Sequence, residues 1–223
     1  MIRAIFFDID GTLMDFKAAE RSAFCRAMAM RGIGHAEERY PRYTVYNKGL
    51  WERMERGEIT RDELLDTRYA RFFEMEGITE SSEGFEALYR ANLCDEHQLM
   101  DGAIDILEYC FAKYPLYIVT NGIAATQRKR INDSKIEKYF KNIYISEEIG
   151  YSKPNKDYFS YCMSDAGLTD PSEILIIGDS VSSDMLGGIN SGLKTCWMNP
   201  KGNKTDLKVD YEIQHLSELK EIL

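Results

Sequence analysis

Five short apolar runs, separated by longer amphipathic segments, constrain the fold of this chain most strongly. The runs are rich in β-branched and aromatic residues, and each ends near Gly, Asn, Asp or Ser; they span residues 2–7, 116–120, 143–146, 174–178 and 194–198. Runs of this kind that alternate with helical segments are typical of buried parallel strands joined by helices. The sequence therefore predicts an α/β fold, a doubly wound (Rossmann-like) and mainly parallel sheet.

The segments between the later runs have helical periodicity. Residues 102–113 place Ile104, Leu107 and Phe111 on one face, which we expect to pack on the sheet. Two more helices are predicted over residues 157–166 and 182–191. The last residues, from about Gly202, mix Lys, Asp and Glu and predict a hairpin or loop that ends in a short helix.

Residues 15–95 do not fit this alternation. They contain no convincing strand but two strongly helical stretches, Lys17 to Met30 and Thr60 to Glu76, and the second opens with a capping-box pattern. A crossover between parallel strands needs only about a dozen residues or somewhat more. We therefore predict that residues 15–95 form an inserted helical cap domain, and that residues 1–14 and 96–223 form the α/β core domain.

Charge and composition exclude several classes of protein. A net charge of −9 disfavours a sequence-independent grip on nucleic acid phosphates. No apolar run approaches the roughly 20 residues that span a bilayer, and the first apolar run is too short for a secretory leader. The 5 cysteines are widely spread and form no Cys-x-x-Cys pair. We expect reduced thiols and a cytoplasmic protein with no membrane or nucleic acid partner.

Polar side chains gather where the predicted strands end. Ligands of open parallel sheets bind beyond the carboxyl ends of the strands. Four of the five runs are followed or ended by residues able to carry chemistry: Asp8, Asp10, Thr120, Asn121, Lys153, Asp179 and Asp184. This convergence predicts an active site at one edge of the sheet.

These residue types suit phosphoryl transfer. An exposed Asp has a pKa of about 3.9, so Asp8 would be ionised at pH 7 and available as a nucleophile. Mg²⁺ held by Asp8 and Asp179 would offset the repulsion between that carboxylate and a phosphate. Lys153 and Thr120 would hold the phosphoryl oxygens. Asp10 could protonate the leaving oxygen and then activate water.

The order of these motifs resembles the haloacid dehalogenase-like (HAD) hydrolase superfamily, with the insertion where that family places its helical C1 cap. The motifs are Asp8-x-Asp10-Gly11-Thr12, Thr120-Asn121, Lys153-Pro154 and Gly178-Asp179-Ser180-x-x-x-Asp184. The resemblance implies Asp8 as nucleophile and Asp10 as general acid and base. It implies Mg²⁺ bound by Asp8, the Asp10 backbone carbonyl and Asp179. By the same resemblance, Asp184 supports the metal site through its water ligands or Lys153, and Thr120, Asn121 and Lys153 bind phosphate.

Three further stretches resemble the nucleoside 5′-monophosphate phosphatases of that superfamily, which include pyrimidine 5′-nucleotidases. They are Leu50-Trp51 with Gly57-Glu58-Ile59-Thr60, residues 145–151, and residues 184–192. Family members that cleave carbon–halogen bonds characteristically lack the second aspartate, so Asp10 disfavours dehalogenation. Among cap aromatics, Phe16 and Trp51 are candidates for contact with the leaving group, although aromatics at helical spacing are more often core residues.

Several alternatives stay open. A sugar-phosphate phosphatase or a phosphomutase would use the same catalytic residues with another cap or acceptor. A phosphoacceptor signalling module also uses an acidic pair, an acceptor Asp, a Thr and a Lys, but it places the acceptor after its third strand. A binding protein that keeps the fold without turnover is disfavoured, because every catalytic position is filled. The sequence leaves a monomer and a dimer equally open. The leading prediction is a Mg²⁺-dependent phosphatase that acts on a small phosphorylated metabolite, above all a nucleoside 5′-monophosphate.

Overall fold

The computed structural model describes all residues, 1–223, and the chain divides into two compact units. The core unit comprises Met1–Phe16 and His97–Leu223, and the cap unit comprises Lys17–Glu96. These bounds differ by one or two residues from the predicted domains 1–14 with 96–223 and 15–95. None of the helices in either unit combines the length and the apolar character needed to cross a membrane.

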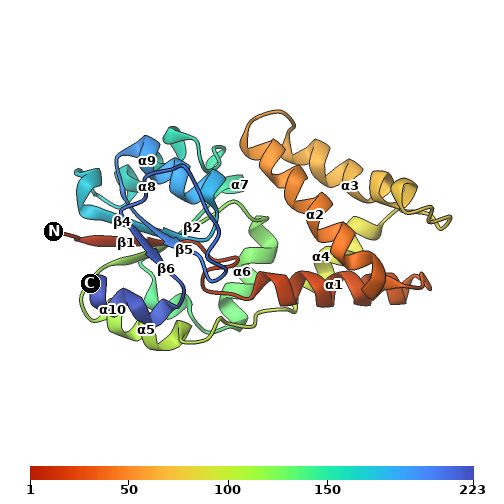
Figure 1. Cartoon of the computed structure of the whole chain (residues 1–223), viewed down its shortest axis with the longest axis horizontal. Coiled ribbons are helices and arrows are strands. Elements are labelled where there is room, and N and C mark those ends of the chain that lie inside the picture. Colours follow the sequence, from red (N-terminus) through yellow and green to blue (C-terminus); the bar gives the residue numbers. More distant parts are fainter. The chain divides into compact units, whose positions relative to one another are not determined.

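The core unit contains a six-stranded sheet in which every neighbouring pair is parallel, in the order β3-β2-β1-β4-β5-β6 (Figure 1). The sheet is therefore of the predicted α/β class. Its first five strands lie at the five predicted runs: β1 Ala4–Phe7, β2 Leu116–Thr120, β3 Asn142–Ile145, β4 Ile174–Gly178 and β5 Lys194–Met198. The central position of β1 places its carboxyl end between those of β2 and β4.

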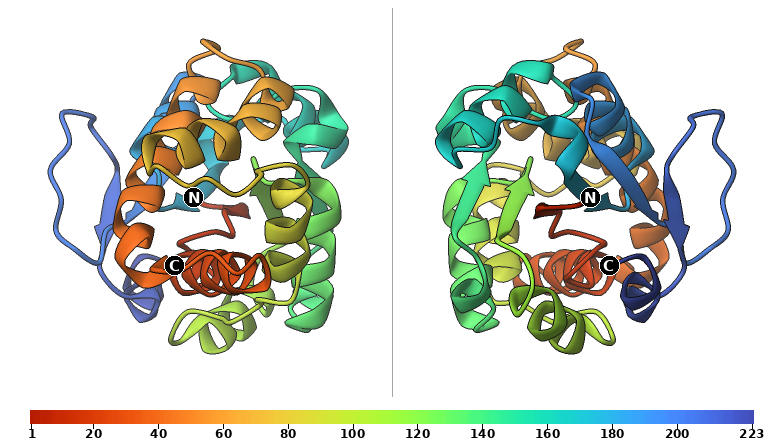
Figure 2. Two further views of the ribbon diagram at one scale, coloured as in Figure 1. Left: turned by 90° about the vertical axis from the view of Figure 1, so that its right-hand side faces the viewer. Right: turned by 90° about the vertical axis from the view of Figure 1, so that its left-hand side faces the viewer.

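Near the end of the chain, where the sequence predicts a hairpin or a loop, the structure has a loop and no hairpin. A sixth strand, β6 (Tyr211–Ile213), pairs with β5 in parallel, and the loop between them projects away from the sheet (Figure 2). Only Ile213 of this short edge strand is buried, so its sequence lacks the apolar run that marks the other five. The predicted short terminal helix is present as α10 (Leu219–Ile222).

Helices cover both faces of the sheet (Figure 1). Successive strand residues point to opposite faces. Ile5 and Phe7 of β1 pack in a cluster with α5 (Ala103–Phe111), α6 (Ala124–Asp133) and α10. Ala4 and Phe6 pack in a second cluster with α8 (Lys156–Asp165). The core unit also contains α7 (Ser146–Ile149), a π-helical turn (Val181–Met185), α9 (Leu186–Ser191) and three 3-10 turns (Glu137–Tyr139, Pro171–Glu173 and Leu216–Glu218).

The buried face of α5 differs from the prediction. Ile106, Leu107 and Cys110 are buried, whereas Ile104 and Phe111 are exposed by 37% and 50%. The segment carries apolar residues on two overlapping stripes, so helical periodicity alone did not decide which stripe packs on the sheet. The exposed Phe111 ring still contacts the Tyr139 ring edge-on, with centroids 5.8 Å apart.

The cap unit is helical, as predicted, but it has two helices that the sequence pattern did not reveal. α1 (Phe16–Met30) and α3 (Arg61–Met75) match the predicted stretches, and α2 (Ala36–Glu55) and α4 (Phe85–Cys94) are additional. Thr60 caps α3, since its hydroxyl accepts a hydrogen bond from the Glu63 amide at 3.1 Å. Stacked aromatic rings fill the interior. The ring centroids of Phe24 and Tyr69 lie 4.4 Å and 5.5 Å from that of Tyr43.

Candidate active site

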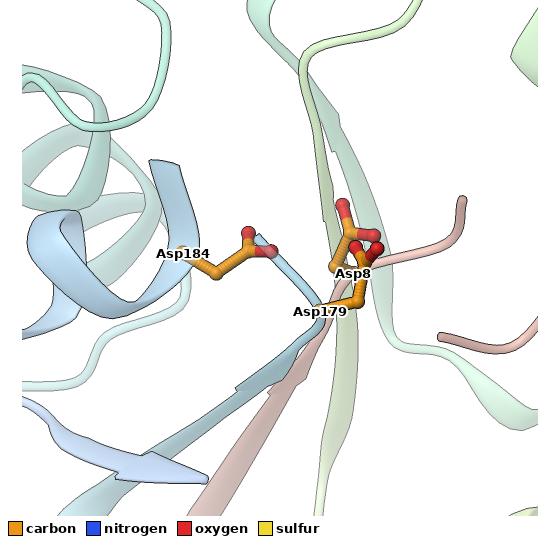
Figure 3. A group of neighbouring side chains, drawn as sticks. All are labelled: Asp8, Asp179 and Asp184. Carbon is orange, nitrogen blue, oxygen red and sulfur yellow. The ribbon is translucent and has the colours of Figure 1, made fainter. Parts of the chain in front are cut away.

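The first and fourth strands deliver two carboxylates to the same edge of the sheet. Phe7 and Ile177 are paired in the ladder, and the Asp8 amide continues it by donating to the Ile177 carbonyl at 2.9 Å. Asp8 and Asp179 thus follow neighbouring strand ends. Oxygens of Asp8, Asp179 and Asp184 lie within 4.8 Å of one another (Figure 3). The predicted convergence of acidic residues is present in the structure.

The turn after β1 makes room for this cluster. Gly11 has φ +86°, a left-handed conformation that residues with side chains rarely adopt. A Cβ at Gly11 would overlap the Asp179 carboxylate. Glycine is therefore required by both the backbone and the close approach of Asp179.

Lys153 bridges two of the clustered carboxylates. Its ammonium donates to Asp8 Oδ1 at 2.6 Å, to Asp184 Oδ1 at 2.6 Å and to the Val119 carbonyl at 2.9 Å. An ammonium has three donors, so all of them are engaged in this state. Asp184 is fully buried, and its Oδ2 accepts from the Ser180 amide at 3.1 Å. Asp184 therefore holds Lys153 in place beside Asp8.

Crowding of carboxylates perturbs their protonation. Burial, together with the negative charges of Asp184, Asp179 and Asp10, raises the pKa of Asp8 well above its ordinary value despite the opposing charge of Lys153. Burial and the charge of Asp184 raise the pKa of Asp179 to about 7. Burial alone would lower the pKa of Lys153, but the charges of Asp184 and Asp8 outweigh it and raise that pKa. The expectation of an ordinary pKa applies to an exposed Asp8, whereas the structure buries this residue.

Thr120 is the last residue of β2, the strand beside β1, and Asn121 follows it. The Asn121 side chain holds the Lys153 backbone on both sides, donating to its carbonyl at 2.8 Å and accepting from its amide at 2.9 Å. Thr120 Oγ1 accepts from the Gly122 amide at 3.1 Å. Direct contact of Asn121 with phosphate stays a prediction, whereas its placement of Lys153 is visible.

Asp10 faces a different set of partners. Its Oδ1 accepts from Arg130 Nη1 at 2.6 Å and its Oδ2 from Gln127 Nε2 at 2.8 Å. Both partners lie on α6 and are 1% exposed. The sequence does not single them out, because Arg128, Lys129 and Arg130 are consecutive basic residues and no local pattern tells which one points inward. The spacing of Gln127 and Arg130, three residues apart on one helical face, is the signal that was available.

Trp197 is a further residue that the motifs do not mark. Its indole N–H donates to the Asp179 backbone carbonyl at 2.9 Å, and the side chain is buried in β5. Trp197 thus fixes the backbone that carries one of the clustered carboxylates.

The two aromatic candidates lie in different units. Phe16 belongs to the core unit, and the Arg130 guanidinium lies 5.9 Å from its ring centroid. Trp51 belongs to the cap unit, is partly buried and packs against the apolar cluster of Leu50, Met54, Ile59 and Leu64. A contact of either ring with a substrate stays a prediction.

The donor set fits a hard divalent cation. Four carboxylates, those of Asp8, Asp10, Asp179 and Asp184, face only two cations, Lys153 and Arg130. With all six groups ionised, two negative charges remain unbalanced, and the clustered ligands are oxygens. Mg²⁺ prefers oxygen ligands and one or two carboxylates. The raised pKa of Asp8 and of Asp179 is what a cation-binding site shows when the cation is absent.

Comparison with known proteins establishes the family. The model of the haloacid dehalogenase-like hydrolases matches residues 2–192 of this chain. The chain belongs to the haloacid dehalogenase-like hydrolases. This HAD protein is therefore an enzyme of the hydrolase class, and the predicted family resemblance is confirmed.

Relatives of this HAD hydrolase match it along nearly its whole length. HAD-hydrolase YfnB of Bacillus subtilis is 40% identical, over 99% of this chain and 95% of its own. The crystal structure of YfnB bound to magnesium has a TM-score of 0.93 and covers 99% of this chain and 98% of its own, at 38% identity.

Two further relatives are named after the substrates on which they act. Pyrimidine 5′-nucleotidase YjjG of Escherichia coli is 33% identical over 98% of this chain and 96% of its own. Pyrimidine 5′-nucleotidase PynA of Streptococcus pneumoniae is 32% identical over 98% of this chain and 94% of its own. The predicted likeness to this subfamily is thereby confirmed.

Proposed function

We propose that this HAD hydrolase is a Mg²⁺-dependent phosphatase that hydrolyses nucleoside 5′-monophosphates through an aspartyl-phosphate on Asp8. The observation that carries the proposal is the unbalanced carboxylate cluster at the carboxyl edge of the sheet, bridged by Lys153, with Thr120 at the end of the neighbouring strand β2. A cluster of acids with too few cations suits a metal ion and an anionic substrate bound together.

Asp8, Asp10 and Asp179 are the residues that we assign to Mg²⁺, Asp10 through its backbone carbonyl. Bound there, the ion would neutralise charge on the transferring phosphoryl group and keep Asp8 ionised. Asp184 would support the site by holding Lys153, whose ammonium it accepts at 2.6 Å. The description of the YfnB structure as bound to magnesium supports the choice of ion.

The chemistry then needs two steps on Asp8. In the first, an Asp8 oxygen attacks phosphorus, the bond from phosphorus to the nucleoside oxygen breaks, and a proton on Asp10 passes to that leaving oxygen. In the second, water attacks the same phosphorus, its proton passes to Asp10, and the bond to Asp8 breaks. Thr120 and Lys153 would stabilise the charge on the phosphoryl oxygens in both steps.

The substrate class is supported by the two pyrimidine 5′-nucleotidases among the relatives. Phe16 and Trp51 are the proposed contacts of the leaving group, and the Phe16 ring already lies beside Arg130 in the core unit. The proposed binding partner is therefore a small phosphorylated molecule. We also propose that the enzyme is cytoplasmic.

The test is phosphate release from a panel of nucleoside 5′-monophosphates and sugar phosphates, with Mg²⁺ and with a chelator. We expect Mg²⁺-dependent release that favours pyrimidine nucleotides. Release from sugar phosphates alone would retain the catalytic residues but overturn the substrate class. No release from folded, Mg²⁺-supplied protein would overturn the proposed activity.

A further inference from the structure

The buried face of α6 joins two groups that belong to different parts of the proposed reaction. Gln127 Nε2 donates to Asp10 Oδ2 at 2.8 Å and to Thr120 Oγ1 at 2.9 Å. Arg130 Nη1 donates to Asp10 Oδ1 at 2.6 Å and to Gln127 Oε1 at 2.9 Å. The four side chains form one continuous network in which the α6 residues are almost completely buried.

Hydrogen-bond chemistry fixes the orientation of the Gln127 amide. Its oxygen faces an arginine, which can only donate, and its nitrogen faces a carboxylate, which can only accept when ionised. The flipped amide would place oxygen against the Asp10 carboxylate and nitrogen against the Arg130 guanidinium, so both contacts would be repulsive. Gly122 leaves the space for this side chain, since a Cβ there would lie 2.6 Å from Gln127 Nε2.

The same network sets the direction of the Thr120 hydroxyl proton. A hydroxyl has one donor and two acceptor lone pairs. Thr120 Oγ1 accepts from the Gly122 amide at 3.1 Å and from Gln127 at 2.9 Å, so both lone pairs are occupied. The proton is left to donate, which is the role that a phosphoryl oxygen requires.

Each oxygen of the Asp10 carboxylate accepts one of these hydrogen bonds and can accept another. Each carboxylate oxygen can accept about two hydrogen bonds, and Arg130 and Gln127 occupy one on each. A lone pair therefore remains on each oxygen for the proton of the leaving group or of water. Arg130 also supplies a positive charge next to a carboxylate that otherwise lies near Asp8 and Asp179, as their raised pKa values indicate.

We propose that Gln127 and Arg130 are positioning residues that align the acid and base Asp10 with the phosphate donor Thr120. The inference rests on the proposed function and assigns separate contributions to the two side chains. Arg130 orients Asp10 and so serves proton transfer to and from oxygen. Gln127 orients Asp10 and Thr120 together and so serves proton transfer and phosphoryl binding.

The test compares Arg130→Lys and Gln127→Met with Arg128→Lys, a control on the same helix whose guanidinium pairs with Glu148. First-turnover rates are measured by rapid quench with two substrates. A nucleoside 5′-monophosphate has a leaving oxygen that needs a proton, whereas p-nitrophenyl phosphate has one that does not. Inhibition by inorganic phosphate reports phosphoryl binding separately.

We expect Arg130→Lys to slow the first turnover of the nucleotide about 10-fold or more and that of p-nitrophenyl phosphate less than about twofold. Gln127→Met should slow both substrates and weaken inhibition by inorganic phosphate about 10-fold. Arg128→Lys should change neither substrate rate. Melting curves confirm folding, and if one variant does not fold, the other still has its own expected result.

Equal losses on the two substrates in Arg130→Lys, or unchanged phosphate inhibition in Gln127→Met, would overturn the assignment. Such outcomes are distinguishable from failure of the proposed function. If the proposed function itself were wrong, the unsubstituted protein would release phosphate from neither substrate.

Discussion

Carboxylates have opposite surroundings in the two units of the molecule. In the cap unit, Glu20 accepts hydrogen bonds from Tyr40, Thr44 and Asn47 at 3.0, 2.7 and 2.7 Å. In the core unit, Asp8 and Asp179 lie beside other carboxylates, and their pKa values are raised. Donors around a buried charge offset the cost of its desolvation within the chain, whereas charges of one sign placed together are typical of a site that binds a cation or a substrate.

Arg68 and Glu76 extend the contrast within the cap unit. The buried Arg68 guanidinium donates to Glu86 at 2.6 and 2.8 Å and to Asn47 at 2.9 Å. Glu76 lies between Arg39 and Arg42, and the hydrogen bond from Arg42 lowers its pKa. Every one of these charges has a partner of opposite sign, which is the pattern missing at the strand ends.

The largest effect is expected from Asp8→Asn. An amide cannot act as the nucleophile, so kcat for the nucleotide should fall by at least about 10³-fold. Steady-state phosphate release measures it, with circular dichroism as the check on folding. Substantial turnover by the folded variant would exclude Asp8 as the nucleophile.

The next largest effect is expected on stability in the cap unit. Arg68→Met leaves Glu86 and Asn47 without their buried donor, and we expect a loss of about 3–5 kcal/mol in the free energy of unfolding. Urea unfolding measures it, with Arg71→Met on the exposed side of α3 as the control. If both variants lose equally little, the cap network does not stabilise the unit as we describe.

Asp179→Asn should stabilise the metal-free fold, in contrast to the loss of stability expected for Arg68→Met. Without metal it removes a charge crowded by Asp184, so the melting temperature in chelator should rise, but by less than about 2 °C, because Asp179 is exposed and solvent screens the repulsion. The stabilisation of the unsubstituted protein by Mg²⁺ should disappear in the variant. The exposed Asp206→Asn is the control. A lower melting temperature in chelator would show that Asp179 is satisfied rather than crowded.

Trp197→Phe tests the backbone support of the same carboxylate. The variant keeps an aromatic ring but loses the hydrogen bond to the Asp179 carbonyl, so Mg²⁺ affinity should fall about 10-fold. Thermal shift against Mg²⁺ concentration measures it. Trp51→Phe in the cap unit should leave the affinity unchanged, and an equal change in both variants would contradict a specific role for Trp197.

The smallest effect concerns pH and the cap unit. The pKa of Glu76 is lower in the folded protein than in the unfolded chain. Its contribution to the free energy of unfolding is therefore fully present above the unfolded pKa and is lost as pH falls through the folded pKa. Glu76→Gln should therefore cost about 0.5–1 kcal/mol at pH 7 and less at pH 3; the effect is small because the Arg42 partner is partly exposed and screened. Melting curves at both pH values measure the difference. An equal cost at the two pH values would show that the charge of Glu76 is not involved.

The sequence was informative where one physical rule governs the outcome. Buried parallel strands require apolar runs, and their carboxyl ends meet at one edge, so Asp8, Asp179 and Lys153 were predictable from position alone. The edge strand β6 was not predictable, because a strand with a single buried residue needs no apolar run.

The partners of Asp10 could not be predicted for a different reason. Choosing Arg130 over Arg128 depends on how α6 is rotated against the sheet, and that rotation is decided by packing of Ile131 rather than by the basic residues. The hydrogen bond from Trp197 likewise depends on the register between β4 and β5. Such contacts between distant segments leave no local pattern in the sequence.

The most direct test of the account is the site of phosphorylation during turnover. The protein is mixed with a nucleoside 5′-monophosphate and Mg²⁺, quenched in acid within the first turnover, and digested for mass spectrometry. We predict a phosphoryl group on Asp8, absent when a chelator replaces Mg²⁺. Phosphate release without any label on Asp8, or a label on another residue, would contradict the central claim.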